Sequence, residues 1–476
     1  MPHILAQSVE ALTTVLAVAG MAYFVAAIVA ARVFVAIRRV RLGAFAPGVS
    51  ILKSLKGQDP GMLDAFRSHC RQNYSGEYEL LFGVSSLQDP AAAAVRQLID
   101  EFPERSIRLI ECPARLGTNG KVSTLAQLAP LAHYDFLLVN DSDITVGPRY
   151  LERVMTCFGP EELTAKRAAE KLDNSGDRGE ESFSGAKARA DSVGSMRGLK
   201  PPPPSVETKS ASVLSFSAAC KAHVDSVGSM RALKRPPLSV LSSSAARKGS
   251  KPVGLVTALY RGRAHGTFAS RFEAMGIATD FLAGVLLSRL IEGGLKYGLG
   301  STLAVSREAL DRIGGFLPLA DHLADDYELG ARVSQAGYRV ALSAEVVETS
   351  IPAYNWRGFA DHQLRWARTV RDASPWGYAG LVFTHGLCWA ALNAIASGLS
   401  PLSLWLLGLS FFLRLTLAMT VGAEVLGDHE VLPGLWLLPV RDAVALGVWA
   451  AGFAGHTIVW RGERFELKDG RLHPAD

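Results

Sequence analysis

Two aspartates separated by a single residue follow a short apolar run of the chain. The run covers residues 136–139, and Asp141, Ser142 and Asp143 come shortly after it. Ligands of open α/β sheets bind at the carboxyl ends of the strands, so these carboxylates would lie at a binding edge. Hard oxygen ligands suit Mg²⁺ or Mn²⁺, and such a cation would bridge a diphosphate. Surface loops also produce a D-x-D pattern by chance, but its place after a buried strand favours a metal site.

Two further acidic positions each allow a structural and a chemical interpretation. Asp89 before Pro90 is typical of a helix N-cap, and the same carboxylate could contact a nucleotide base or ribose. Asp325 and Asp326 mark the start of another helix, where capping is the simpler explanation. In a dry pocket beside other acids, the pKa of a carboxyl rises toward neutral. Asp326 could then act as the general base that takes a proton from an attacking hydroxyl.

A fourth motif, Gln363-Leu364-Arg365-Trp366, stands just before the C-terminal apolar region. Arg365 could neutralise a diphosphate, and Trp366 could stack on a sugar or lie at the membrane interface. Taken alone, a basic and aromatic belt at the membrane surface explains these residues better.

The elements that would position these motifs alternate between strands and helices. Buried strands are predicted at residues 49–52, 79–84, 108–110 and 135–139, and helical patterns lie between them at 62–72, 91–101 and 121–131. This alternation predicts an α/β domain with a parallel sheet and helices on both faces. We expect residues 42–160 to form its first half and 251–372 its second half.

Composition indicates a membrane protein. The chain has 476 residues, 49% of them hydrophobic, and a mean hydropathy of +0.17. A net charge of +5 gives no reason to expect a nucleic-acid partner. Five cysteines without a C-x-x-C pair support neither a zinc site nor a disulfide framework.

An N-terminal transmembrane helix is predicted over residues 8–36, because residues 11–31 carry no charge. Arginines follow it at positions 32, 38, 39 and 41, which places the catalytic part in the cytoplasm by the positive-inside rule. A cleaved signal sequence is disfavoured, because its basic cluster would precede the apolar run.

The C-terminal region, residues 373–460, contains three apolar segments near 378–398, 402–424 and 435–460. If all three cross the membrane, the basic tail 461–476 lies outside, against the positive-inside rule. We favour an interfacial or re-entrant first segment, which returns this tail to the cytoplasm. Arg441 and Asp442 then lie within a span, where charges pair or face protein.

Residues 161–250 interrupt the α/β pattern. They are rich in serine and charge, and residues 191–200 return in nearly the same form as 225–234. The spacing also occurs in helical solenoids, but the apolar periodicity of a solenoid is missing. We therefore predict a low-complexity, disordered insertion.

Together, the motifs resemble membrane glycosyltransferases of family-2 type with a GT-A (Rossmann-like) fold. The matching order is Asp89, the D-x-D pair, Asp326, and the Q-x-x-R-W motif that ends at Trp366. The similarity is greater to ceramide glucosyltransferases and to the glycosyltransferases of bacterial hopanoid biosynthesis. It is carried by residues 49–57, 88–90, 117–122, 298–302 and 324–329, and it covers most of residues 1–160 and 252–476. The insertion departs from the family pattern close to the predicted site.

The resemblance implies an inverting hexosyltransferase of glycolipid biosynthesis. Its donor would be a UDP-sugar with Mg²⁺ or Mn²⁺, and its acceptor a lipid hydroxyl in the bilayer. The implied roles are nucleotide contact for Asp89, metal and diphosphate binding for Asp141 and Asp143, catalytic base for Asp326, and lining of the diphosphate and acceptor side for Gln363, Arg365 and Trp366. Lys53 and Lys121 are candidate nucleotide or phosphate contacts, with a solvated surface position as the alternative.

The sugar could be glucose or N-acetylglucosamine, and the acceptor ceramide or a hopanoid polyol. Alanine- and arginine-rich usage favours a bacterial inner membrane. A polysaccharide synthase is the first alternative, although it would need a channel of more spans. The second is an inactive membrane scaffold disrupted by the insertion.

Overall fold

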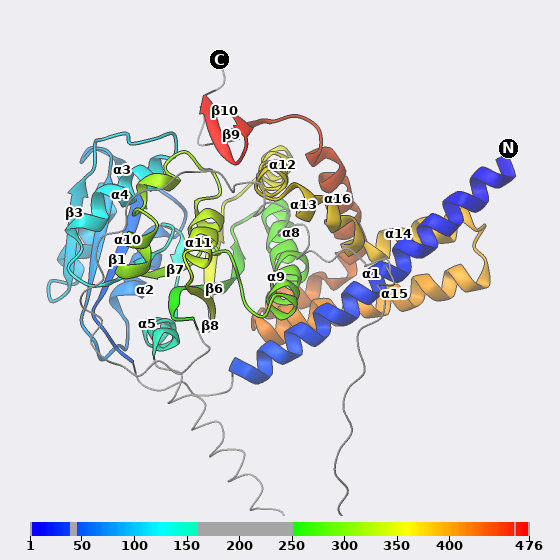
Figure 1. The fold of residues 1–476 in the computed structure, drawn as a ribbon, viewed down its shortest axis with the longest axis horizontal. Coiled ribbons are helices and arrows are strands. Elements are labelled where there is room, and N and C mark those ends of the chain that lie inside the picture. Colours follow the sequence, from blue (N-terminus) through cyan, green and yellow to red (C-terminus); the bar gives the residue numbers. More distant parts are fainter. Residues whose placement is uncertain (1, 39–44, 160–250, 461–462, 475–476) are drawn as a thin grey trace, which may run out of the picture.

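The computed structural model describes residues 2–38, 45–159, 251–460 and 463–474 (Figure 1). The predicted insertion at 161–250 and the arginines at positions 39 and 41 lie outside these residues. A sheet domain occupies one side of the molecule and a group of long helices the other, with α8, α9 and α12 between them (Figure 1).

The N-terminal half of the sheet follows the predicted strands. β1 (Val49–Leu55), β2 (Tyr78–Val84), β3 (Ser106–Glu111) and β4 (Phe136–Val139) pair in parallel in the order β3-β2-β1-β4. Ile51 of β1 aligns with Leu80 on one side and Leu138 on the other. All three side chains are buried, as expected for strands that are covered on both faces. The predicted α/β fold class is confirmed.

The second half makes the sheet mixed rather than parallel throughout. β6 (Val253–Ala264) and β8 (Arg339–Ile351) run parallel to each other, and the short edge strand β5 (Ile144–Thr145) runs antiparallel to β8. Between the halves, β7 (Leu303–Ser306) pairs antiparallel with both β4 and β6. β7 follows a helix and a tight loop. It therefore does not fit the strand–helix–strand order that predicts parallel pairing.

Within the described residues, six helices belong to the sheet domain. They are α2 (Met62–Cys70), α3 (Pro90–Glu101), α4 (Gly120–Leu128), α5 (Tyr150–Met155), α10 (Arg307–Arg312) and α11 (Asp325–Gln335). Three of them, α3, α4 and α10, begin at a side-chain cap. Asp89 and Asn119 cap α3 and α4 by accepting backbone N–H bonds. These caps place the first turns of α3 and α4 beside the carboxyl ends of the strands.

Four helices within the described residues are long and apolar enough to cross a membrane: Ala6–Arg38, Phe268–Ile291, Pro401–Val425 and His429–Gly452. The first belongs to α1 (Pro2–Arg38), and the last two contain α15 (Pro401–Met419) and α16 (Leu438–Gly452). A pair bent by 56°, Pro375–Thr384 and Gly386–Ala396, would make a fifth if it is one span. Its second part, α14 (Gly386–Ala396), packs on α1, where Gly20 meets Gly386 so closely that a Cβ on Gly20 would lie 2.2 Å from the Gly386 Cα.

The sequence did not predict the apolar helix between the sheet and α1. It consists of α8 (Phe268–Gly276), a π-helical turn (Ile277–Phe281) and α9 (Leu282–Ile291). The charged residues Glu273 and Asp280 interrupt its apolar pattern, which hid it among the soluble elements. α8 packs on β6 and α9 on α1, so this helix joins the sheet domain to the membrane helices.

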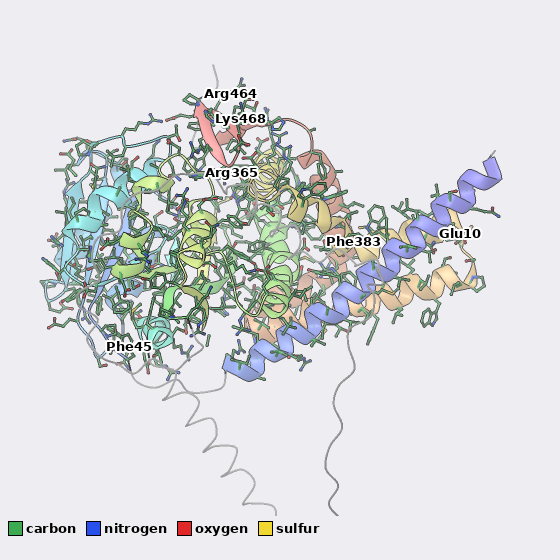
Figure 2. All side chains as sticks on the ribbon, in the orientation of Figure 1. Glu10, Phe45, Arg365, Phe383, Arg464 and Lys468 are labelled. Atoms are coloured by element: carbon green, nitrogen blue, oxygen red, sulfur yellow. The ribbon has the colours of Figure 1, made fainter. Side chains whose placement is uncertain are left out.

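The C-terminal residues form a small antiparallel sheet, β9 (Thr457–Trp460), β10 (Glu463–Lys468) and β11 (Arg471–Pro474), where a simple tail was expected. It packs on α12 (Trp356–Ala373), close to the labelled Arg365 (Figure 2). The Leu472 N–H donates to the Asp321 carbonyl over 2.8 Å, and Arg368 donates to the Thr457 carbonyl over 2.6 Å.

These contacts place the C-terminus on the same side of the membrane as the sheet domain. Three of the four long apolar helices and the bent pair lie between residues 45 and 457. The arrangement that we favour from the sequence, with two C-terminal spans and an interfacial first segment, stays a prediction.

Candidate active site

Asn140 holds the end of β4 in place. Its amide nitrogen donates to the Ser301 carbonyl over 2.6 Å and to the Tyr150 hydroxyl over 2.9 Å. Its amide oxygen lies 3.1 Å from Nε2 of His69. Burial lowers the pKa of His69 to about 3, so this imidazole is neutral and serves as a fixed polar partner. The loop that carries Asp141 and Asp143 therefore starts from a rigid point.

Lys53 supports the same loop from beneath. It is fully buried on β1, and its ammonium donates to the Asp141 carbonyl over 3.0 Å. Burial lowers the pKa of Lys53 to about 7, against the opposing effect of Asp143 and Asp141. This position excludes the solvated-surface alternative. A direct contact of Lys53 with the nucleotide stays a prediction.

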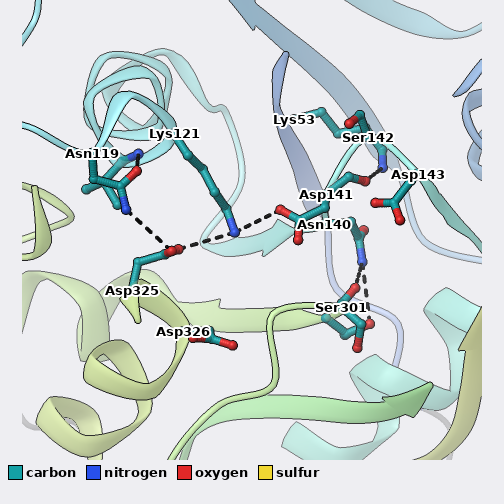
Figure 3. Close-up of polar contacts among 12 residues, drawn as sticks. Lys53, Asn119, Lys121, Asn140, Asp141, Ser142, Asp143, Ser301, Asp325 and Asp326 are labelled. Carbon is teal, nitrogen blue, oxygen red and sulfur yellow. Dashed lines mark hydrogen bonds and ion pairs between the residues drawn. The ribbon is translucent and has the colours of Figure 1, made fainter. Parts of the chain in front are cut away.

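Lys121 joins two of the acidic motifs (Figure 3). Its Nζ lies 2.8 Å from Oδ1 of Asp141 and 3.2 Å from Oδ2 of Asp325. Burial opposes the charge of this ammonium, but the carboxylates of Asp141 and Asp325 outweigh burial and raise the pKa of Lys121. Residues nearly 200 positions apart in the chain thus meet around one cation.

Asp326 lies in the first turn of α11, next to this cluster. Burial, and next the charge of Asp325, raise the pKa of its carboxyl to about 6 against the opposing charge of Lys121. A Cβ on Gly300 would lie 3.0 Å from Oδ2 of Asp326 and 3.8 Å from Oδ2 of Asp141. The two carboxylates therefore lie near the same point of the chain, where a side chain would press against Asp326.

Asp143 completes the acidic group on the far side of the D-x-D loop. Its Oδ2 accepts a hydrogen bond of 2.5 Å from the Thr349 hydroxyl. Burial, together with the charge of Asp141, raises the pKa of the Asp143 carboxyl to about 6. No three or more His, Cys, Asp or Glu side chains are grouped for a metal among the residues that the structure describes. A cation held by Asp141 and Asp143 would need its other ligands from a bound diphosphate or from water.

Asp89 has the structural role that its sequence context predicts. Its Oδ1 accepts the Ala91 N–H at the start of α3 and the Gly57 N–H beyond β1, both over 2.9 Å. The carboxylate thus ties two strand-end loops together. The nucleotide contact implied by the resemblance stays a prediction.

The Q-x-x-R-W motif lies on α12, between the acidic group and the membrane helices. Gln363 accepts a hydrogen bond of 3.4 Å from Arg441 of α16, and the Trp366 ring lies 5.9 Å from that of Phe281. Arg365 is close to Tyr354. Burial raises the pKa of Tyr354, and the charge of Arg365 opposes this rise only in part. Gln363 and Trp366 therefore face the membrane side, whereas the four acidic motif residues gather at the sheet edge.

The sequence did not single out three residues of this site. Asn140 directly precedes the D-x-D pair, and its position before the first aspartate was the available signal. Glu273 and His362, whose Oε1 and Nδ1 lie 2.8 Å apart, join α8 to α12 beside Gln363. Single charged residues in two distant helices carry no spacing that could have revealed this contact.

Comparison with known proteins identifies the family. The model of glycosyl transferase family 21 matches residues 12–165 and 238–473, and it leaves out a stretch within the predicted insertion. Ceramide glucosyltransferase 3 of Caenorhabditis elegans is 21% identical over 444 residues, which are 91% of this chain and 75% of that protein. Ceramide glucosyltransferase of Komagataella phaffii is 32% identical over 110 residues, which cover 22% of this chain and 21% of that one.

Among solved structures, a mannosyltransferase from Pyrobaculum calidifontis, in complex with GDP-Man and Mn²⁺, aligns with 94% of this chain and 99% of its own. The identity is 15% and the TM-score 0.45, too low to identify a fold or a ligand. The family match confirms the predicted resemblance, the GT-A fold class with membrane helices and the class of enzyme, a hexosyltransferase. The chain belongs to glycosyl transferase family 21.

Proposed function

We propose that the protein is a membrane-bound, inverting glycosyltransferase that moves a sugar from a UDP-sugar to a lipid hydroxyl. The observation that carries this proposal is the pair of carboxylates, from Asp141 and Asp326, that lie beside Gly300. One belongs to the D-x-D loop and suits the diphosphate side, and the other is the buried carboxyl of Asp326.

Asp326 has the properties of a general base near neutral pH. A pKa of about 6 leaves most of this carboxyl ionised at pH 7, yet basic enough to accept a proton. In the proposed step, Asp326 takes the proton of the acceptor hydroxyl as its oxygen bonds to the anomeric carbon. The bond from that carbon to the diphosphate breaks, and UDP leaves with the electron pair. A single displacement of this kind inverts the anomeric configuration.

The leaving diphosphate needs positive charge beside it. Lys121 already lies within 3.2 Å of two carboxylates at this edge, and Arg365 follows on α12. Asp141 and Asp143 fit Mg²⁺ or Mn²⁺, because they offer hard oxygens and carry like charges close together. When bound, such a cation would offset the negative charge of the diphosphate.

A lipid acceptor agrees with the way the site meets the membrane helices. α12 and the α8–α9 helix lie between the acidic group and α1, α15 and α16. An apolar cavity of about 750 Å³ lies between α14, α15 and α16, lined by side chains such as Leu387, Leu407 and Phe411. The names of the relatives suggest ceramide and glucose, and a hopanoid polyol and N-acetylglucosamine are the other members of the proposed substrate class. We place the catalytic side in the cytoplasm of a bacterial cell.

The test is UDP release by the protein purified in detergent, with Mg²⁺ or Mn²⁺ present. UDP-glucose and UDP-N-acetylglucosamine are each offered with ceramide or bacteriohopanetetrol, and Asp326→Asn is the control. We expect release that requires one lipid and disappears in the variant. A long carbohydrate product would indicate a polysaccharide synthase instead. Absence of both turnover and stabilisation by UDP plus Mn²⁺ would indicate an inactive scaffold.

A further inference from the structure

Four polar side chains meet between α8, α12 and α16, on the membrane side of the acidic group. They are Glu273, His362, Gln363 and Arg441, and we call them the interhelix cluster. Glu273 and Arg441 are only 3% and 5% exposed. Nδ1 of His362 lies 2.8 Å from Oε1 of Glu273, but at an angle too oblique for a good hydrogen bond.

Several buried polar atoms of this cluster have no hydrogen-bond partner. Within the described part of the chain, these atoms are Oε2 of Glu273, Nδ1 of His362, and Nε and Nη1 of Arg441. The remaining Arg441 nitrogen, Nη2, makes only a long bond of 3.4 Å to Gln363. A buried polar group without a partner costs free energy. Four such atoms in one cluster therefore point to a ligand.

Arg441 is held in place without being neutralised by direct contact. Its guanidinium packs over the Phe272 ring at 5.7 Å, against Gly276, where any side chain would collide with it. No ion pair within 4.0 Å joins it to Glu273 or another carboxylate among the described residues. Glu273 and Arg441 thus carry opposite charges in one buried cluster, and each keeps polar atoms without a partner.

A group that satisfies these atoms must donate to the Glu273 carboxylate and accept from the Arg441 guanidinium. A hydroxyl does both with one atom, and an amide does so with its N–H and its carbonyl. The cluster is lined on one side by aromatic rings, with His362 lying 5.4 Å from Trp366 and 5.5 Å from Tyr354. Such rings suit a partly apolar molecule that carries a few polar groups.

The cluster is connected to the proposed catalytic base through Tyr260. Burial raises the pKa of this tyrosine, and so do the negative charges of Asp326 and Glu273. The Tyr260 ring lies 6.0 Å from Phe281, which in turn lies 5.9 Å from Trp366. A molecule anchored at the cluster could therefore extend along these rings toward Asp326.

We propose that the interhelix cluster binds the polar headgroup of the acceptor lipid, with Glu273 accepting from and Arg441 donating to its hydroxyl or amide group. This inference rests on the proposed function, since it names the acceptor site of that reaction. It makes Glu273, Arg441 and His362 binding residues, and it leaves proton removal to Asp326.

The test measures binding separately from turnover. Fluorescent NBD-labelled short-chain ceramide is titrated into the purified full-length protein in detergent, and bacteriohopanetetrol is used as a competitor. We expect Glu273→Gln and Arg441→Gln each to weaken binding about tenfold or more, because each leaves a charged partner or headgroup unpaired. Arg32→Gln and Glu424→Gln remove an exposed ion pair of 2.9 Å on the same helical region and should bind like the wild type.

Two further measurements keep the result clear. Stabilisation by UDP reports whether each variant is folded. If Arg441→Gln does not fold, Arg441→Lys is used in its place. Ceramide methylated on its amide nitrogen separates the two chemistries, because it loses affinity only if Glu273 accepts from the N–H. Wild-type affinity in both cluster variants, or no binding by the wild type, overturns the inference. Binding without UDP release overturns the proposed function and leaves the headgroup site standing.

Discussion

Two groups of charged residues differ in how completely their polar atoms are paired. At the sheet edge, Lys121 bridges Asp141 and Asp325, while the carboxyls of Asp143 and Asp326 keep pKa values of about 6. Between the membrane helices, Arg414 of α15 forms two bonds of 2.8 and 2.7 Å to Asp442 of α16, and a third of 2.8 Å to the Thr279 carbonyl. The first group has more negative than positive charges. In the second, Arg414 and Asp442 satisfy each other, and we call them the closed pair.

This difference in pairing separates charges that stabilise the structure from charges that are available for chemistry. Every nitrogen of the Arg414 guanidinium has a hydrogen-bond partner, so Arg414 and Asp442 hold α15 against α16. Carboxyls whose pKa values are raised by burial and by each other are typical of functional sites. Arg441, one residue before Asp442, lies among the membrane helices but resembles the sheet-edge group in being unsatisfied.

The largest expected effect falls on the sheet-edge group. Asp326→Asn keeps the shape of the side chain and removes the proposed base, so we expect kcat to fall by about 10²–10⁴-fold. The folded protein should be no less stable, because an ionised carboxyl in this site is unfavourable. UDP release and thermal unfolding measure the two effects. A variant that keeps a tenth of the wild-type rate would exclude Asp326 as the base.

The opposite result is expected for the closed pair. Asp442→Asn leaves the Arg414 charge buried without its carboxylate, and we expect a loss of about 3–5 kcal/mol in the free energy of unfolding. Glu424→Gln breaks an exposed pair with Arg32 and should cost about 0–1 kcal/mol. Unfolding in detergent, followed by tryptophan fluorescence, compares the two variants. The rate per folded Asp442→Asn molecule should stay within a few-fold of the wild type, and a selective loss of kcat would contradict a purely structural role.

The same contrast explains what could be predicted from the sequence. The parallel strands β1 to β4 each contain a short apolar stretch and are separated by helical patterns, and local pattern alone reveals such strands. Asp141, Asp143 and Asp326 were recognised because ordered motifs mark them, although their roles stay predictions. The closed pair was anticipated only in that Asp442 would find a partner; its identity, Arg414, depends on how two helices rotate against each other.

Other features depend on tertiary structure that no local pattern contains. The helix α8–α9 was missed because Glu273 and Asp280 break its apolar run, and those charges are tolerated only because protein surrounds them. The antiparallel strand β7 has four residues, too few for its direction to be inferred. The sequence offered Lys53 as a phosphate contact or a surface lysine, and only its place on a central strand makes it a buried support for the Asp141 loop.

The charge balance at the sheet edge can be shifted by removing its cation. Lys121 lowers the pKa of Asp326, so Lys121→Met should raise it and move the acidic limb of the kcat/KM profile to higher pH. In the wild type we expect this limb near pH 6. A profile measured from pH 5 to 8 with saturating metal checks both values, with Lys296→Met, which removes an exposed lysine on the surface, as the control. An unmoved limb in Lys121→Met would separate Lys121 from the titration of Asp326.

The same carboxyl predicts a trend in stability. Its pKa in the folded protein, about 6, lies above the ordinary value of 3.8, so the folded state binds its proton more tightly than the unfolded state does. The contribution of Asp326 to stability is therefore fully present below pH 3.8 and is lost as the pH rises through 6. Asp326→Asn should remove this part of the pH dependence. A difference between wild type and variant that does not change between pH 4 and 7 would contradict the raised pKa.

The smallest effect is expected where the two carboxylates meet. Gly300→Ala would place a methyl group 3.0 Å from Oδ2 of Asp326, so that the carboxylate must give way by a few tenths of an ångström. Because bases act only at hydrogen-bonding distance, we expect kcat to fall about tenfold while the affinity for UDP changes little. Gly120→Ala is the matched control, since a Cβ there meets nothing within 4 Å. If Gly300→Ala weakened UDP binding as much as kcat, the methyl group would be acting on Asp141 and the diphosphate, and Gly300 would belong to the donor side of the site.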